Sequence, residues 1–186
     1  TDAVFITGAI EAWEERIIAC FDIPGAFLHA ICKDGHTYMK LRGKLAELMV
    51  LIEPKLYREY VRYPNGQAEL YVQMTKALYG MLKSALWFYQ KLRDDLEADG
   101  FIVNDYDLCV ANKIVNGTQM TVTWHVDDLK VLQKDQAAID EFAQFLRDKF
   151  EKPEQGLMLT YHQGKIHDYL GIDLDYSEKK KLKVSM

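Results

Sequence analysis

The sequence contains few of the residues that hold together small secreted proteins or zinc modules. Only three of its 186 residues are cysteine, at positions 20, 32 and 109, and no Cys-x-x-Cys pair occurs. An odd number of widely spaced cysteines predicts reduced thiols in an intracellular protein rather than disulfides or a zinc site. The chain also lacks an apolar run of membrane-spanning length and the start of a signal peptide. We therefore expect a cytoplasmic protein without a membrane partner, and its start at Thr1 indicates an excised fragment.

Positive charge is also scarce. Lysine and arginine number 23 against 28 acidic residues, so the net charge is −5. This balance argues weakly against a protein that binds nucleic acid without other protein regions. The basic side chains gather near the middle of the chain and at its C-terminus: Lys76, Lys83, Lys91 and Arg93, and then Lys179, Lys180, Lys181 and Lys183. A run of charges is usually a solvated surface, and this is the favoured interpretation of the C-terminal lysines.

Hydrophobic residues make up 49% of the chain and aromatic residues 12%, which is enough for a folded core. The length predicts one domain, or one domain with a small lobe. Thr1 or Asp2 can cap an N-terminal helix, because four apolar residues follow helical spacing: Ile6, Ile10, Trp13 and Ile17.

Short elements are predicted next. The pattern indicates a buried strand ending at residue 21, a helical turn at 26–29, a strand at 38–41, and partly helical structure over 44–60 that Pro54 interrupts. The sequence Pro64-Asn65-Gly66 predicts a hairpin turn between 60–63 and 70–72.

The second half of the chain predicts a meander. Asn116-Gly117 is the strongest hairpin signal, between 109–115 and 118–124. A further turn at Asp127-Asp128 completes three antiparallel strands with an acidic pair at the second corner. A strand at 170–174 is expected to return through 181–186.

Two helices are predicted beside this meander. Gly100 suits the C-terminal end of the first helix, and Asp135 suits the N-cap of the second. The apolar face of the first helix consists of Leu82, Leu86, Tyr89, Leu92 and Leu96. The apolar face of the second consists of Ile139, Phe142, Leu146 and Phe150. The element order predicts an α+β fold with helices packed on one face of an antiparallel sheet.

Three carboxylates are placed where they could meet. Asp127 and Asp128 share a tight turn, where their like charges destabilise the fold unless a cation neutralises them. Asp22 directly follows the buried strand that ends at Phe21. Each acidic position by itself is more often an ordinary turn residue. Carboxylates that converge at strand ends are, however, what a pair of Mg²⁺ ions requires for phosphoryl or nucleotidyl transfer.

Five sequence blocks carry a family resemblance. In order, they are FDIPGAFLHA, KALYGMLKSALWFYQKL, GFIVNDYDLCVANK, HVDDLKV and DYLGIDLDYS. Together they resemble the reverse transcriptase of copia-type LTR retrotransposons over nearly the whole chain, 1–186. The resemblance implies a single polymerase palm-like domain with part of the fingers, in a fragment that lacks the thumb and RNase H regions.

The resemblance implies an RNA-directed DNA polymerase that uses two Mg²⁺ ions, for which Mn²⁺ can substitute. By motif, Asp22 corresponds to the first catalytic aspartate, and Asp127 and Asp128 to the later pair; all three are the implied metal ligands. The implied partners are an RNA or DNA template with its primer, dNTPs, and the remaining fingers, thumb, RNase H and integrase regions of a polyprotein. The implied location is the cytoplasm, within virus-like particles.

Nucleotide and primer contacts follow from the same resemblance. Residues 23–26 would offer backbone N–H groups to the triphosphate, and Phe27 corresponds to the aromatic gate that excludes a 2′-hydroxyl. Without the resemblance, Phe27 would be interpreted as a core residue. Gly80 corresponds to a glycine beside the template–nucleotide pair. The segment that resembles the primer grip is Tyr169, Leu170 and Gly171. The implied nucleotide-binding residues are Ile23, Gly25, Ala26, Phe27 and Gly80.

Three departures from the family pattern leave an alternative open. His125 stands where the family usually has Tyr, and its charge varies with pH. A Lys-Gln-Ala-Pro-Arg motif is replaced by LKSAL at 82–86, and the segment 43–66 is long. The alternative is an inactive or domesticated reverse-transcriptase-like domain that binds nucleic acid or protein. A third interpretation, an α+β binding module whose acids are only turn residues, requires Asp22 to lie far from Asp127.

Overall fold

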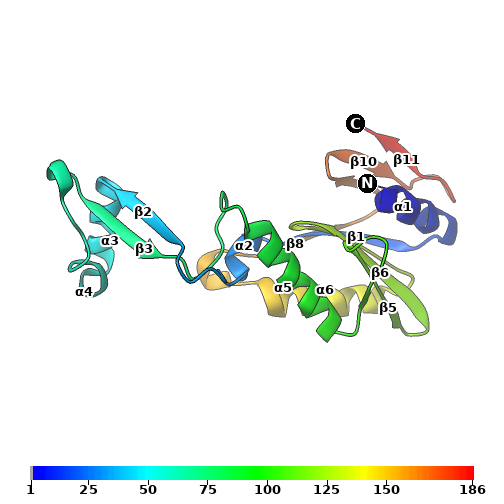
Figure 1. Ribbon diagram of the computed structural model, residues 1–186. Helices are drawn as coiled ribbons and strands as arrows, with labels where there is room; N and C mark the ends of the chain where they lie inside the picture. Colours follow the sequence, from blue (N-terminus) through cyan, green and yellow to red (C-terminus); the bar gives the residue numbers. More distant parts are fainter. Residues whose placement is uncertain (1) are drawn as a thin grey trace.

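The computed structural model describes residues 2–186, and its centre is a six-stranded antiparallel sheet (Figure 1). The strand order is β4-β5-β6-β7-β1-β8. The bounds are β1 Ile17–Asp22, β4 Ile102–Val103, β5 Val110–Val115, β6 Thr118–His125, β7 Asp128–Gln133 and β8 Thr160–Gln163. The predicted meander is therefore present as β5-β6-β7. Its Asn116-Gly117 turn has the positive φ angles, 50° and 76°, that a two-residue hairpin turn requires.

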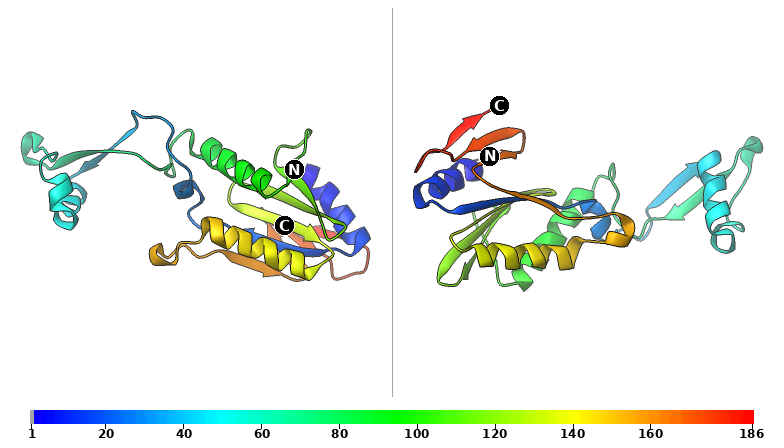
Figure 2. Two further views of the ribbon diagram at one scale, coloured as in Figure 1. Left: turned by 90° about the horizontal axis from the view of Figure 1, so that it is seen from below. Right: turned by 180° about the vertical axis from the view of Figure 1, so that it is seen from behind.

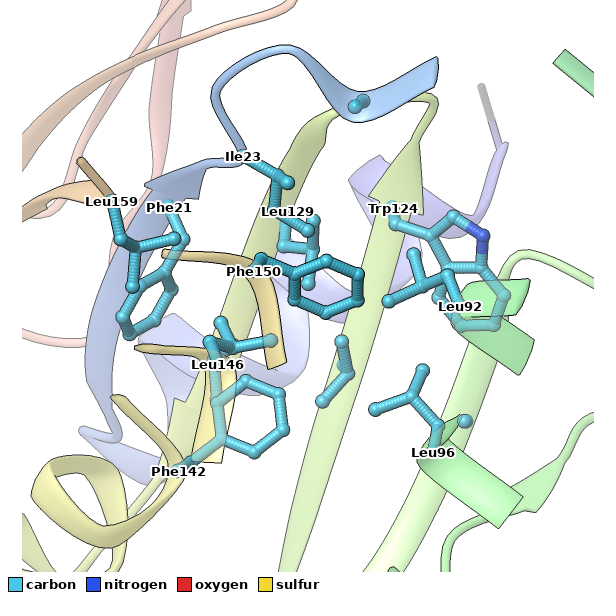
Figure 3. Close-up of a cluster of buried hydrophobic side chains, with 14 of the residues drawn as sticks. Phe21, Ile23, Leu92, Leu96, Trp124, Leu129, Phe142, Leu146, Phe150 and Leu159 are labelled. Atoms are coloured by element: carbon cyan, nitrogen blue, oxygen red, sulfur yellow. The ribbon is translucent and has the colours of Figure 1, made fainter. Parts of the chain in front are cut away.

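Two helices cover one face of this sheet and form the main core. They are α5 (Ser84–Ala98) and α6 (Gln136–Phe150). The predicted N-cap is present, since the Asp135 carboxylate accepts a hydrogen bond from the Ala137 amide at 3.0 Å. Figure 3 shows the packing of Phe142, Leu146 and Phe150 against strand side chains such as Phe21 and Leu129. The predicted apolar face of α6 is thus correct.

The apolar face of α5 was predicted only in part. Leu92 and Leu96 are fully buried, but Leu82 is 98% exposed and Leu86 is 52% exposed. Trp87 and Phe88 are buried in their place. The helix begins at Ser84, so Leu82 precedes it. Because Trp87 and Phe88 are buried and Leu86 is exposed, the face that meets the sheet is rotated from the one that spacing suggested.

The opposite face of the sheet is covered at one end by α1 (Asp2–Glu14) and by a small sheet. The small sheet contains β9 (Ile166–Tyr169), β10 (Ile172–Asp175) and β11 (Lys183–Ser185). Val4, Tyr169 and Leu174 form the buried core beneath them. The predicted return of the chain after residue 181 is correct, whereas Leu170 lies in the turn before β10.

The predicted inner face of α1 is wrong. Ile6, Ile10 and Trp13 are 61%, 43% and 68% exposed. Ile17 belongs to β1. The buried side of α1 carries Glu11, whose carboxylate pairs with the buried Lys130 of β7 at 2.5 Å. Because the buried cation needs a partner, the helix faces the sheet with its acidic residue, and its larger apolar residues remain exposed to solvent. Thr1, one of the two predicted caps, lies outside the described residues.

A second lobe projects from the sheet between α2 (Ala26–His29) and α5 (Figures 1 and 2). It contains β2 (Tyr38–Arg42), α3 (Lys44–Ile52), α4 (Pro54–Tyr57), the 3₁₀ turn η1 (Pro64–Gly66) and β3 (Glu69–Gln73). Leu41, Ala46, Ala68 and Leu70 form its own small core. The long 43–66 segment is therefore structured.

The hairpin predicted at Pro64-Asn65-Gly66 is wrong in its pairing. The turn is present, but Arg62 and Glu69 make only an isolated bridge across it. The main partner of β3 is β2, with Leu41 opposite Leu70. A second 3₁₀ turn, η2 (Pro153–Gln155), follows α6. Within residues 2–186, no helix has the length and apolar character to cross a membrane. The predicted α+β class is confirmed.

Candidate active site

The three candidate carboxylates lie together at one end of the central strands. Asp22, the last residue of β1, is directly opposite Asp128 of β7, so both side chains share one face of the sheet. The Ile23 amide donates to the Asp127 carbonyl at 3.0 Å. The corner itself is Val126-Asp127, with Val126 at φ 57°, and Asp128 already belongs to the strand. The turn therefore lies one residue earlier than the sequence predicted.

The surroundings make negative charge unfavourable here. Desolvation, reinforced by the nearby Asp127 carboxylate, raises the pKa of Asp22. Desolvation also raises the pKa of Asp128, with Asp127 and Asp22 adding to the effect. Among residues 2–186, no lysine or arginine forms an ion pair with these three carboxylates. His125, opposite Asp128 in the β6–β7 ladder, is the nearby group that opposes the rise.

The donor set suits a hard divalent cation. Carboxylate oxygens are the ligands that Mg²⁺ prefers, and it usually completes its shell with water and substrate phosphates. In the described part of the chain, no group of three or more His, Cys, Asp or Glu side chains has the spacing of a preformed metal cage. Asp22, Asp127 and Asp128 are close enough to perturb one another, and their chemistry fits the implied ions.

An aromatic pair adjoins the carboxylates. Phe27, on α2, is half-buried, and its ring centroid lies 4.4 Å from that of Tyr79. The Tyr79 hydroxyl donates to Asp127 Oδ2 at 3.4 Å, and desolvation followed by Asp127 raises its pKa. The sequence interpretation missed Tyr79, although it stands next to Gly80 in a block that carries the resemblance. Gly80 has φ 92°, a conformation that favours glycine.

The 23–26 segment is more restrained than expected. The Ile23 amide is already used by the Asp127 carbonyl, and the Ile23 and Ala26 side chains are fully buried. Gly25 has φ 60°, and a Cβ there would lie 3.2 Å from Leu157. These contacts fix the segment that joins β1 to α2, the helix that carries Phe27.

The predicted Tyr169-Leu170-Gly171 segment is the turn of the β9–β10 hairpin. Leu170 and Gly171 have φ 57° and 75°, and Tyr169 pairs with Ile172 across the turn. Burial raises the pKa of the Tyr169 phenol, and the Asp128 carboxylate adds to this effect. The Lys130 ammonium lies 5.9 Å from the centroid of the Tyr169 ring, so the hairpin packs over β7, the strand that carries Asp128. The structure thus brings Asp22, Asp127, Asp128 and Phe27 together, with Gly80 next to Tyr79.

An antiparallel sheet with helices on one face and carboxylates at the end of its central strands matches the class expected from the sequence, a polymerase palm. A family model described as reverse transcriptase (RNA-dependent DNA polymerase) matches residues 1–185. The chain belongs to this family, so the predicted resemblance is confirmed.

Structural comparison agrees on the fold. The chain is similar to apo telomerase from Candida tropicalis truncated from the C-terminal domain, with a TM-score of 0.50 and 9% sequence identity. The similarity covers 100% of this chain and 40% of the telomerase chain, so this chain spans less than half of that protein. At this identity the similarity concerns the fold alone. A search of curated proteins found no match.

Proposed function

We propose that this chain is the palm, with part of the fingers, of an RNA-directed DNA polymerase from a copia-type retrotransposon polyprotein. It would join a dNTP to a primer 3′-hydroxyl on an RNA or DNA template. The observation that carries the proposal is the convergence of Asp22 with Asp127 and Asp128, which lie more than one hundred positions apart in the sequence. The binding-module interpretation that required their separation is thereby disfavoured.

Asp22 and Asp127 would hold the two metal ions, and Asp128 would support them from the adjacent strand. When bound, the ions would lower the pKa of the primer hydroxyl and stabilise the leaving pyrophosphate. The protein supplies position and charge: β1 and β7 fix Asp22 and Asp128 through their ladder. The three carboxylates are at least partly exposed and have no ion-pair partner among residues 2–186, which favours an external cation.

Phe27 and Tyr79 would form one wall of the nucleotide pocket. Their close packing fixes the Phe27 ring beside the carboxylates, where it would leave no room for a ribose 2′-hydroxyl. Gly80, adjacent to Tyr79, would let the template–nucleotide pair approach the backbone. Residues 25–27 would contact the triphosphate, with the Ile23 amide engaged within the fold.

The β9–β10 turn would contact the primer terminus, and the projecting β2–β3 lobe would be the partial fingers. Residues 1–186 would act as one palm and fingers unit alongside thumb, RNase H and integrase regions. The proposed setting is the cytoplasm, in virus-like particles.

The proposal is tested by divalent-cation binding and primer extension. We expect Mg²⁺ titration by calorimetry to show binding that Asp22→Asn and Asp127→Asn lose. The same two variants should lose extension of a DNA primer on an RNA template. Asp140→Asn, which changes an exposed carboxylate on α6, should keep both properties. Extension retained by Asp127→Asn would refute the assigned role.

A further inference from the structure

A cleft on the helix side of the palm gathers five lysines from separate parts of the chain. It has a volume of about 430 Å³, and its lining residues come from α2, α5, the end of α6 and the segments that follow α2 and β3. We call it the lysine cleft. Its charged lining consists of Lys33, Lys76, Lys91, Lys149 and Lys152, with Asp94 and Asp95. Five cations against two carboxylates give a local charge of +3, in a chain whose net charge is −5.

The two acids of the cleft neutralise only part of the charge of its five lysines. Lys91 and Lys149 share one carboxylate, that of Asp95, at 2.8 and 3.3 Å. The Asp94 carboxylate is engaged by Arg93 at 2.5 Å, outside the cleft. The remaining lysines lack an acidic partner within residues 2–186: Lys33 donates to Gln90, Lys76 to the His29 carbonyl, and Lys152 forms no ion pair.

The lysines also act on one another. Desolvation lowers the pKa of Lys76, and the charges of Lys152 and Lys91 lower it further. Desolvation likewise lowers the pKa of the buried His29 imidazole, and Lys152, Lys91 and Lys76 reinforce that decrease. Like charges held together in this way destabilise the fold unless an anion enters between them.

The C-terminal lysines make a useful contrast. Lys179 pairs with Glu15, and Lys181 and Lys183 both pair with Glu178. These charges are satisfied within the fold and lie on the solvated surface, as the sequence suggested. In the lysine cleft, by contrast, Lys33, Lys76 and Lys152 form no ion pair with any acid among residues 2–186.

We propose that the lysine cleft binds backbone phosphates of a single nucleic-acid strand, at a site separate from the carboxylate corner. The site is open rather than enclosed, and its cations lie on several elements around it, so a flexible strand can place successive phosphates against them. Phe27 and His29 lie on the same short helix, with Phe27 beside the carboxylates and His29 lining the cleft. The helix α2 therefore contributes one residue to the cleft and another to the proposed nucleotide pocket. The choice of nucleic acid as the anion rests on the proposed function; the anion site itself rests on the charges.

The test is the salt dependence of binding to a labelled single-stranded RNA, measured by fluorescence anisotropy without divalent cations. We expect Lys76→Gln/Lys152→Gln to bind roughly tenfold more weakly. The slope of log affinity against log salt should also decrease by about 1.4, because each lost phosphate contact removes roughly 0.7. Lys179→Gln/Lys181→Gln removes the same charge elsewhere and should change neither quantity. Lys33→Gln/Lys149→Gln, in more exposed positions, repeats the test if the first variant has a lower melting temperature.

Each outcome separates this site from the polymerase proposal. Asp22→Asn should bind the RNA as tightly as the wild type, since binding at the cleft needs no metal. An equal loss in the cleft and C-terminal variants would show that net charge alone governs binding, and would overturn the site. Displacement of the RNA by inorganic pyrophosphate at an equal concentration of phosphate groups would assign the cleft to a free anion instead. A lysine-dependent interaction without primer extension would leave the cleft standing and remove the polymerase function.

Discussion

Two neighbouring pairs of residues on the same face of β1 and β7 differ in whether their charged side chains form ion pairs. At the end of the strands, Asp22 and Asp128 face each other, and neither forms an ion pair with a lysine or arginine of residues 2–186. One step inward, Cys20 faces Lys130, which is fully buried and paired with Glu11 at 2.5 Å. The fold thus pairs the buried charge of Lys130, whereas the carboxylates proposed to bind metal have no ion-pair partner among residues 2–186.

The inner pair belongs to a closed network. The Lys130 ammonium also donates to Thr7 Oγ1 at 3.1 Å, and the Tyr176 hydroxyl donates to Glu11. The network connects α1, β7 and the end of the β9–β10 hairpin. Because every charged member has a partner, the cost of removing them from water is offset by direct contacts. In the described part of the chain, the carboxylate corner has no ion pair, and the Tyr79 hydroxyl donates to Asp127.

The largest expected effect comes from breaking the inner pair. Lys130→Met or Glu11→Leu alone should lower the free energy of unfolding by about 3–5 kcal/mol, because each leaves one buried charge without its partner. The double variant should recover part of this loss. Urea unfolding measures all three. Lys134→Gln removes an exposed pair with Glu14 and should change stability little; a similar response from Lys130→Met would contradict the contrast drawn here.

A smaller effect is expected at Phe27, beside the open corner. Phe27→Ala should admit rNTPs in primer extension, because it removes the ring that would clash with a 2′-hydroxyl. The half-buried ring should also cost about 1–3 kcal/mol of stability, less than a fully buried phenylalanine. Phe88→Leu is the packing control, since Phe88 is buried behind Phe27. If Phe27→Ala is destabilised yet keeps its sugar preference, the residue only packs.

The smallest effect concerns the pH dependence of the corner. Desolvation, with repulsion from Asp127 and Asp22, raises the pKa of Asp128 in the folded state above its ordinary value of 3.8. The folded state therefore loses stability as pH rises through that raised pKa. Asp128→Asn, in EDTA, should be more stable than the wild type at neutral pH, by at most about 1 kcal/mol because the site is partly solvated.

This gain should diminish as pH falls and disappear below about pH 3, where the carboxyl is mostly protonated in both states. Urea midpoints across this range measure it. Adding Mg²⁺ should stabilise the wild type more than the variant, since a ligand stabilises only the state that binds it. A variant whose advantage is independent of pH would show that repulsion at the corner is not the cause.

Local signals predicted much of the framework. The Asn116-Gly117 turn fixes the β5–β6 register by its positive φ angles, and the Asp135 side chain fixes the start of α6 through one hydrogen bond. The apolar stripe of α6 also predicted its buried face, because that face consists of apolar side chains that pack in the main core. The position of Asp22 after a buried strand placed it correctly at a strand end.

The sequence by itself determined the elements, the acidic corner and the family, because turn chemistry, strand alternation and motif order act over short distances along the chain. Tertiary structure alone decided which face of α1 is buried: periodicity favoured Ile6, Ile10 and Trp13, but Lys130, more than one hundred residues away, required Glu11 inside. It also decided that Lys76 and Lys91 meet Lys33, Lys149 and Lys152 in one cleft. Coulomb interactions depend on distance in space, and only the folded chain sets those distances.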